Sequence, residues 1–230
     1  MTSPETPHVP VIPPPRFFFA VSITAGLCFA GWTWFVQPGT AVPPTFDLEC
    51  AQFWRAWSAA HAGPWGLMVF MTDIGGVAGN TLVAIMGAIW QTALNRRFLA
   101  VAWLGIVVGG GLINMATKHT FDRPRPAPVL RDRAVLESNQ SYPSGHSMGS
   151  MVGYGLLGYA LILPQRRRPR RIATVLLMTC IVLTVGFSRI YLRAHWFSDV
   201  IAGWSIGLCW VSVCIACLEM RRRRLLAQAL

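Results

Sequence analysis

Long stretches without charged residues alternate along the chain with short clusters of charged ones. Six such stretches occur, at residues 17–36, 74–94, 98–117, 147–163, 172–187 and 200–218. A helix that crosses the roughly 30 Å hydrocarbon core of a bilayer needs about 20 apolar residues, within a range of about 17–25. Four stretches meet this length, and the two shorter ones, 147–163 and 172–187, can include neighbouring polar residues at the membrane surface. The pattern predicts an all-α fold, an integral membrane bundle of six transmembrane helices.

Composition argues against a soluble or disordered protein. Of the 230 residues, 53% are hydrophobic and only 13% are charged, whereas soluble domains carry about 25% charged residues. A soluble fold would also need six helices that are apolar on all sides and have almost no polar face for water. We therefore expect the bilayer to be a main partner of this chain.

The basic residues predict the orientation in the membrane. The N-terminal segment, the second-to-third and fourth-to-fifth connections and the C-terminal segment together hold twelve basic and two acidic residues. The remaining connections hold eight basic and seven acidic residues. Lys and Arg in short connections stay preferentially on the cytoplasmic side, so both termini are predicted to be cytoplasmic. The net charge of +11 is then explained by the basic residues that set the membrane orientation and attract anionic lipid headgroups. No nucleic-acid partner is expected.

Three segments lie outside the predicted spans. Residues 1–16 are rich in proline and predict a disordered cytoplasmic tail, and 221–230 predicts a basic cytoplasmic tail, which leaves 17–220 as the six-span domain. The first apolar stretch is longer than the roughly 7–15 residues of a signal peptide, which favours a retained helix. Segment 41–65 is rich in Trp and Phe, as is typical of the membrane surface. It is either an interfacial anchor or a surface helix beside a route for lipids.

Polar and charged residues gather at the predicted span ends on the outer surface. They are Lys118, Arg125, Ser144, His146, Arg189, His195 and Asp199. Ionisable side chains near membrane depth are costly, so they indicate a functional site by default. One such residue alone could be an interfacial anchor, but the group as a whole predicts a site at the outer face.

The residue types in this group suit an oxyanion. Lys118, Arg125 and Arg189 supply one point charge and two planar guanidinium groups, which are the donors that hold phosphate. Ser144 and Gly145 stand at the start of a predicted helix, whose N–H groups would face the same anion. Gly145 also lets the backbone approach a ligand closely. Ser144 equally suits an ordinary helix N-cap.

The two histidines predict phosphoryl chemistry. His195 and Asp199 are four residues apart, so on a helix the carboxylate can orient one imidazole nitrogen and raise the basicity of the other. Such an imidazole can attack phosphorus and form a phosphohistidine, and His146 could protonate the leaving oxygen and later activate water. A metal site is the alternative use of these residues. Three nearby cations would repel a divalent metal, so no metal and no cofactor are expected.

Three motifs carry a family resemblance. They are K-x6-R-P at 118–126, P-S-G-H at 143–146 and S-R-x5-H-x3-D at 188–199. Together they resemble the type 2 phosphatidic acid phosphatase superfamily, whose integral-membrane members are lipid phosphate and pyrophosphate phosphatases. The resemblance implies that Lys118, Arg125, Ser144, Gly145 and Arg189 bind the phosphoryl oxygens, with His146 as general acid, His195 as nucleophile and Asp199 as its orienting partner. Asp122 and Arg123 occupy unspecified positions of the first motif and are left out of the expected site.

The expected function is therefore that of a membrane lipid phosphatase. It would remove the terminal phosphate from undecaprenyl pyrophosphate, phosphatidylglycerol phosphate or phosphatidic acid through a phosphohistidine, and no residue separates these substrates. A bacterial cytoplasmic membrane with the site on the periplasmic face is expected, and the oligomeric state stays open. Two alternatives stay open as well: a phosphotransferase that passes the phosphoryl group to another lipid such as lipid A, and a transporter or other anion-binding membrane protein.

Overall fold

The computed structural model describes residues 12–40, 42–61, 63–132 and 140–228. Within these residues the chain forms helices and loops without a strand, which confirms the predicted all-α fold. The helices of the described chain are α1 (Pro15–Val36), α2 (Thr45–Ala60), α3 (Trp65–Gly75), α4 (Val77–Ala93), α5 (Arg97–Phe121), α6 (Gly145–Ile162), α7 (Arg168–Tyr191) and α8 (Phe197–Gln228).

The number of membrane-spanning helices differs from the prediction. In the described part of the chain, α1, α5, α7 and α8 are long and apolar enough to cross a membrane, and α3 with α4 makes a fifth span if this pair, bent by 52°, crosses as one. Six spans are therefore not confirmed. The difference lies at α6, which mixes Gly, Ser and Tyr with its apolar residues and buries ten of its eighteen residues. A helix that packs inside the protein needs less apolar surface than one that faces lipid.

The predicted stretch 74–94 is interrupted near its start. Helix α3 ends at Gly75, Gly76 is extended with φ −74° and ψ −176°, and α4 begins at Val77. A Cβ atom on Gly76 would lie 3.2 Å from Nε2 of His146. The missing side chain therefore lets the break between α3 and α4 pass close to the start of α6.

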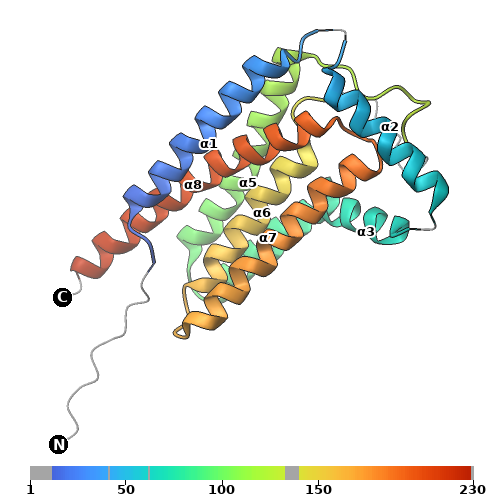
Figure 1. Ribbon diagram of the computed structural model, residues 1–230. Helices are drawn as coiled ribbons and strands as arrows, with labels where there is room; N and C mark the ends of the chain where they lie inside the picture. Colours follow the sequence, from blue (N-terminus) through green and yellow to red (C-terminus); the bar gives the residue numbers. More distant parts are fainter. Residues whose placement is uncertain (1–11, 41, 62, 133–139, 229–230) are drawn as a thin grey trace, which may run out of the picture.

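Helix α6 lies at the centre of the bundle. It contacts α3, α4, α5, α7 and α8, while α1 packs along α8 (Figure 1). Helix α8 approaches α6 closely at Gly203, where a Cβ atom would lie 2.6 Å from the backbone oxygen of Ser144. A larger residue would not fit without a shift, so Gly203 brings the first turns of α8 and α6 together.

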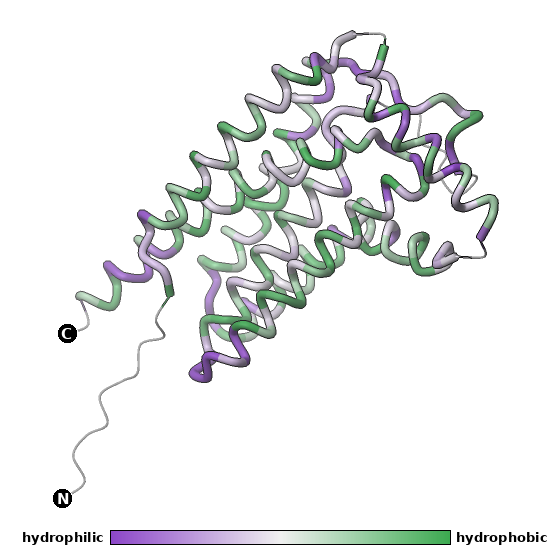
Figure 2. Tube along the Cα trace, viewed as in Figure 1, coloured by the Kyte–Doolittle hydropathy of each residue, from purple (hydrophilic) through white to green (hydrophobic). Residues whose placement is uncertain are grey.

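Apolar side chains cover the outside of the long helices (Figure 2). Leu27, Val101 and Leu176 expose 68%, 71% and 63% of their surface. Hydrophilic residues concentrate instead at the helix ends, including the α6–α7 connection (Figure 2). An apolar exterior is favourable in contact with lipid, whereas its exposure to water would cost free energy. We conclude that the chain is a multi-pass membrane protein.

The start of α1 and the end of α8 lie at the same end of the bundle, together with the basic α6–α7 connection (Figure 1). Residues 1–11 lie outside the described residues, and so does most of the predicted tail 1–16. Helix α8 continues to Gln228, so the arginines at 221–224 lie on its last turns. The boundaries 17–220 of the predicted six-span domain stay a prediction.

Helix α2 covers the opposite end of the bundle (Figure 1). It forms from the aromatic segment expected at 41–65 and contacts α7 and α8. Trp54 and Trp57 pack on Tyr191 at the end of α7, with ring centroids 5.5 and 6.0 Å apart. Asp47 in the first turn of α2 is fully buried. The surface helix is thus attached through both apolar and charged contacts.

Candidate active site

The three motifs meet at the end of the bundle opposite the chain termini. Lys118 lies near the end of α5, Arg189 near the end of α7 and Asp199 in the first turn of α8. The P-S-G-H segment leads into α6, while Arg125 and His195 lie in loops. Because every motif residue stands at or near a helix end, packing of these ends gathers the predicted site.

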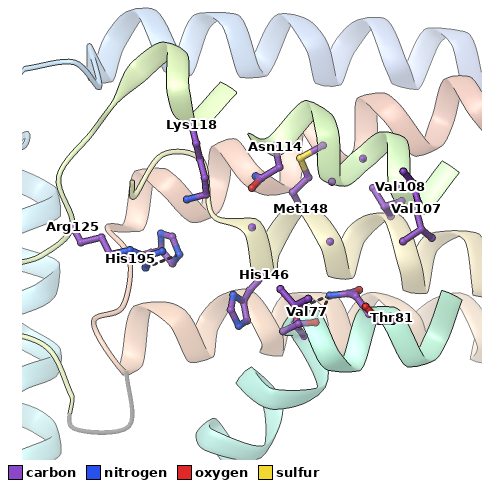
Figure 3. Close-up of a pocket in the computed structure, with 18 residues that line it drawn as sticks. Val77, Thr81, Val107, Val108, Asn114, Lys118, Arg125, His146, Met148 and His195 are labelled. Atoms are coloured by element: carbon purple, nitrogen blue, oxygen red, sulfur yellow. Dashed lines mark hydrogen bonds between the residues drawn. The ribbon is translucent and has the colours of Figure 1, made fainter. Parts of the chain in front are cut away.

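A cavity of about 680 Å³ opens where these ends meet (Figure 3). Five predicted site residues line it, namely Lys118, Arg125, Gly145, His146 and His195. The other three are buried and are not part of the cavity wall, namely Ser144, Arg189 and Asp199. The structure therefore brings all three segments together, but it exposes only part of the predicted set to the cavity.

Each predicted phosphate-binding cation is held by the protein. Nη1 of Arg125 donates to the backbone oxygen of Ala194 at 2.8 Å. Lys118 donates to the backbone oxygen of Gln140, and Arg189 donates to the hydroxyl of Thr72 in α3. Their positions are thus fixed before a ligand binds, which lowers the entropy cost of binding an anion.

His195 lies between a carboxylate and a cation. Its Nδ1 is 3.4 Å from Oδ2 of Asp199, a distance that exceeds the usual hydrogen-bond range. The two residues were expected on one helix face, but His195 lies in the loop that precedes α8. Its Nε2 is 3.1 Å from Nη1 of Arg125, and Figure 3 shows these two side chains pointing towards one another at the cavity. The ring thus directs Nδ1 towards the buried acid and Nε2 towards the cavity.

Asp199 is fully buried and receives several hydrogen bonds. The Trp196 backbone N–H donates to Oδ2 at 2.9 Å, and the Ser141 hydroxyl donates to the same oxygen. Nη1 of Arg123 donates to Oδ1 at 2.6 Å. With both oxygens accepting bonds, the carboxylate has a fixed orientation beside His195.

Ser144 forms the N-cap of α6. Its hydroxyl oxygen accepts a hydrogen bond from the Ser147 backbone N–H at 3.3 Å. Gly145 and His146 in the first turn line the cavity. Backbone N–H groups of a first helical turn lack partners within the helix and favour an anion, so this part of the wall suits a phosphate.

The loop before α6 is anchored to neighbouring elements. The Tyr142 hydroxyl lies 2.6 Å from that of Thr33 in α1, and the Ser141 backbone N–H donates to the carbonyl of Arg123 at 2.8 Å. Burial raises the pKa of Tyr142 to about 12, so this phenol stays neutral at physiological pH. These bonds hold the P-S-G-H segment against the rest of the site.

Arg123 belongs to the site, although sequence reasoning left it out. Only 2% of its surface is exposed. Besides its bond to Asp199, it donates to the Ser198 hydroxyl at 2.6 Å and to Oδ2 of Asp47 at 2.8 Å. Burial raises the pKa of Asp47, although hydrogen bonds from Ser198 and the cation of Arg123 oppose this shift.

The sequence offered only a weak signal for this pair. Arg123 stands inside the first motif, but the motif does not specify its position. Asp47 is one of few acidic residues in an aromatic segment and lies 76 residues earlier in the chain. Only the packing of α2 across the bundle end brings the two together.

Within the described residues, no three His, Cys, Asp or Glu side chains are grouped as candidate metal ligands. The acids near His195 bond to Arg123, Ser141 and Ser198. Independence from metal stays a prediction, tested below with a chelator.

The fold and the converged motifs define a class of membrane phosphatase, and comparison with known families agrees. Residues 79–223 match the model of the PAP2 superfamily. The chain belongs to this superfamily, which confirms the resemblance inferred from its three motifs.

Curated relatives are phosphatases of different lipids. The chain is 32% identical over 158 residues to phosphatidylglycerophosphatase B of Bacillus subtilis (strain 168), which covers 63% of this chain and 71% of the relative. It is 28% identical over 151 residues to undecaprenyl-diphosphatase of Sulfolobus acidocaldarius, covering 64% and 66%. It is 32% identical over 148 residues to lipid A 1-phosphatase of Rhizobium johnstonii, covering 57% of this chain and 54% of the relative.

A solved structure shares the fold. The crystal structure of a transmembrane PAP2-type phosphatidylglycerolphosphate phosphatase from Bacillus subtilis superposes with a TM-score of 0.72, covering 86% of this chain and 96% of that one. At 22% identity, this likeness concerns the fold alone. Family and fold together support a lipid phosphatase.

Proposed function

We propose that this protein hydrolyses the terminal phosphate of a membrane lipid phosphate or pyrophosphate through a phosphohistidine on His195. The observation that carries this proposal is the shape of the cavity. It continues from Lys118 along α5 to Val107 (Figure 3), a distance of about 16 Å at 1.5 Å per residue. A cationic end joined to a channel of this length, lined mostly by apolar residues together with Asn80, Thr81 and Asn114, fits a phosphorylated headgroup with the first part of its tail.

The proposed reaction has two steps. His195 Nε2 forms a bond to phosphorus while the bond to the lipid oxygen breaks, and His146 gives a proton to that oxygen. His146 then takes a proton from water, which attacks phosphorus, breaks the P–N bond and releases phosphate. Lys118, Arg125 and the Gly145 amide, which line the cavity, would balance the charge on the transferred group, and Arg189 and Ser144 would act from their buried positions behind the wall. Asp199 would stabilise the positive charge that develops on His195.

Three substrates remain candidates: undecaprenyl pyrophosphate, phosphatidylglycerol phosphate and phosphatidic acid. The named relatives act on phosphatidylglycerophosphate, undecaprenyl diphosphate and lipid A. All of these carry a terminal phosphate on an apolar anchor, which is the chemistry that the cavity accepts. We propose further that the site faces the periplasm of a bacterial cytoplasmic membrane, because the basic connections lie at the opposite end.

Phosphate release by the detergent-purified protein tests this function. The panel contains the three lipids and a soluble phosphate ester, with no acceptor lipid. We expect release from at least one lipid, and we expect His195→Ala to lower kcat at least about a thousandfold because it removes the nucleophile.

His61→Ala is the matched control, because His61 is an exposed histidine at the end of α2. It should keep wild-type activity. Unchanged turnover in folded His195→Ala would contradict the covalent scheme. Transfer to an added lipid A acceptor without release of free phosphate would instead support a phosphotransferase.

A further inference from the structure

A buried series of charges runs from the surface helix α2 to His195. Oδ2 of Asp47 is 2.8 Å from Nη2 of Arg123, and Nη1 of Arg123 is 2.6 Å from Oδ1 of Asp199. Oδ2 of Asp199 is in turn 3.4 Å from Nδ1 of His195. All four side chains are at most 2% exposed. Charges that are this well shielded from water interact more strongly than surface pairs do.

Both carboxylate oxygens of Asp47 accept hydrogen bonds. Besides Arg123, the backbone N–H and the hydroxyl of Ser198 donate to its two oxygens. Ser198 immediately precedes Asp199, so Asp47 binds both the cation and the backbone next to the orienting acid. Trp54 and Trp57 also pack on Tyr191, so the contacts of Asp47 come in addition to an apolar attachment of α2.

We propose that Asp47 is a positioning residue for the proposed nucleophile, acting through Arg123 and Asp199. This inference rests on the proposed function and assigns a role to the α2 segment that its sequence left open. Arg123 is shared between two carboxylates, so Asp47 fixes the guanidinium plane and offsets part of its charge. The negative charge of Asp199 is then offset less by Arg123, so it stabilises a positive charge on the His195 imidazole more strongly.

Asp47 is expected to influence the chemical step rather than substrate binding. Attack on phosphorus places positive charge on the His195 ring, and Asp199 stabilises that charge. Without the acid at position 47, the cation of Arg123 is balanced by Asp199 alone, which weakens this stabilisation. Substrate binding depends instead on the cations at the cavity, which do not touch Asp47. Loss of Asp47 should therefore lower kcat and leave KM unchanged.

A pH profile separates this role from a purely structural one. His195 faces Asp199, Ser141 and Arg125, and it shares the cavity wall with Lys118 and His146. Removing one negative charge from behind Asp199 disfavours protonation of the imidazole. Because the nucleophile must be neutral, the acid limb of the kcat profile should move to lower pH.

The test compares Asp47→Asn with Glu49→Gln, which removes an equal charge from an exposed position on the same helix. For Asp47→Asn we expect kcat to fall about ten- to a hundredfold, as for other residues that orient a reacting group, with the acid limb moved to lower pH. Asp47→Glu should recover part of kcat. Glu49→Gln should match the wild type in both measurements.

A second variant covers the case in which Asp47→Asn does not fold, because the substitution breaks one of the two buried ion pairs of Arg123 and breaking a buried pair is strongly destabilising. The double variant Asp47→Asn with Arg123→Gln removes that charge. It should still lower kcat, because Asp199 loses the donor that holds its Oδ1 in place, while its acid limb returns towards the wild-type position. Wild-type kcat in this double variant would overturn the inference.

The outcomes separate the inference from the proposed function. Activity that depends on His195, combined with an Asp47→Asn profile identical to that of Glu49→Gln, would overturn the positioning role alone. Full activity in His195→Ala would overturn the proposed mechanism itself.

Discussion

At the scale of single residues, His195 is defined by what lies on either side of its ring. Asp199 approaches Nδ1 at 3.4 Å, and Arg125 approaches Nε2 at 3.1 Å. The third motif predicted His195 and Asp199 as neighbours on one helix face, but α8 begins at Phe197, so the loop before the helix brings the His195 ring beside Asp199. The motif could not predict Arg123, whose carboxylate partners come from two distant segments.

Treatment with a chelator tests whether side-chain cations, rather than a metal ion, supply the positive charge of the site. We expect phosphate release to be unchanged in excess EDTA, because Lys118, Arg125 and Arg189 supply the positive charge that a metal would otherwise provide. Activity is measured before and after dialysis against EDTA. Loss of activity that is restored by a divalent cation would contradict the metal-independent scheme.

At the scale of elements, α5 joins the two parts of the cavity. Its cavity-lining residues lie on one face of the helix, where spacings of three and four positions recur: Val107, Val108, Gly110, Gly111, Asn114 and Lys118. Helix α4 supplies the facing wall because Gly76 breaks its continuity with α3. The sequence predicted a single continuous span at 74–94 because the length of the uncharged stretch alone set its bounds, although the Gly75–Gly76 pair within it favours a break.

Filling the channel at Gly111 should separate lipid from soluble substrates. No atom lies within 4 Å of a Cβ built on Gly111, so Gly111→Phe should fold and project into the cavity. Displacing about two methylene groups of the substrate from contact costs about 1.6 kcal/mol, which lowers kcat/KM for a lipid about tenfold. Hydrolysis of a soluble phosphate ester should not change.

Gly105→Phe is the control for this variant. Gly105 also has open space around its Cβ position but does not line the cavity. Its kinetics should match the wild type with every substrate. An equal loss in both variants would show that the substitution acts through the membrane or the fold rather than through the channel.

At the scale of the whole molecule, the two ends of the bundle differ in kind. One end carries both described chain ends and the arginines of the α6–α7 connection, and the other carries the cavity and α2. Arginine-rich ends stay preferentially in the cytoplasm, which supports a site on the periplasmic side. A lipid phosphate of the outer leaflet would then reach the cavity with its tail in the bilayer.

Labelling with a membrane-impermeant maleimide tests this orientation in intact bacterial cells. All six native cysteines are replaced by Ser in both variants, because Cys28, Cys180 and Cys217 are exposed as well. Glu49→Cys on α2 should be labelled, whereas Arg167→Cys in the α6–α7 connection should be labelled only after the cells are opened. Both positions are exposed, so access from water is equal. The reverse pattern would place the site in the cytoplasm.

The sequence by itself determined the helical class, the membrane environment and the set of motif residues, because apolar stretches and short motifs are local features. Tertiary structure decided where the helices begin and end, including the break at Gly76, and that α6 packs its polar and small residues inside the bundle. It also decided which motif residues line the cavity and that Asp47 and Arg123 join the site. These features depend on contacts between residues far apart in the chain, and no local pattern encodes them.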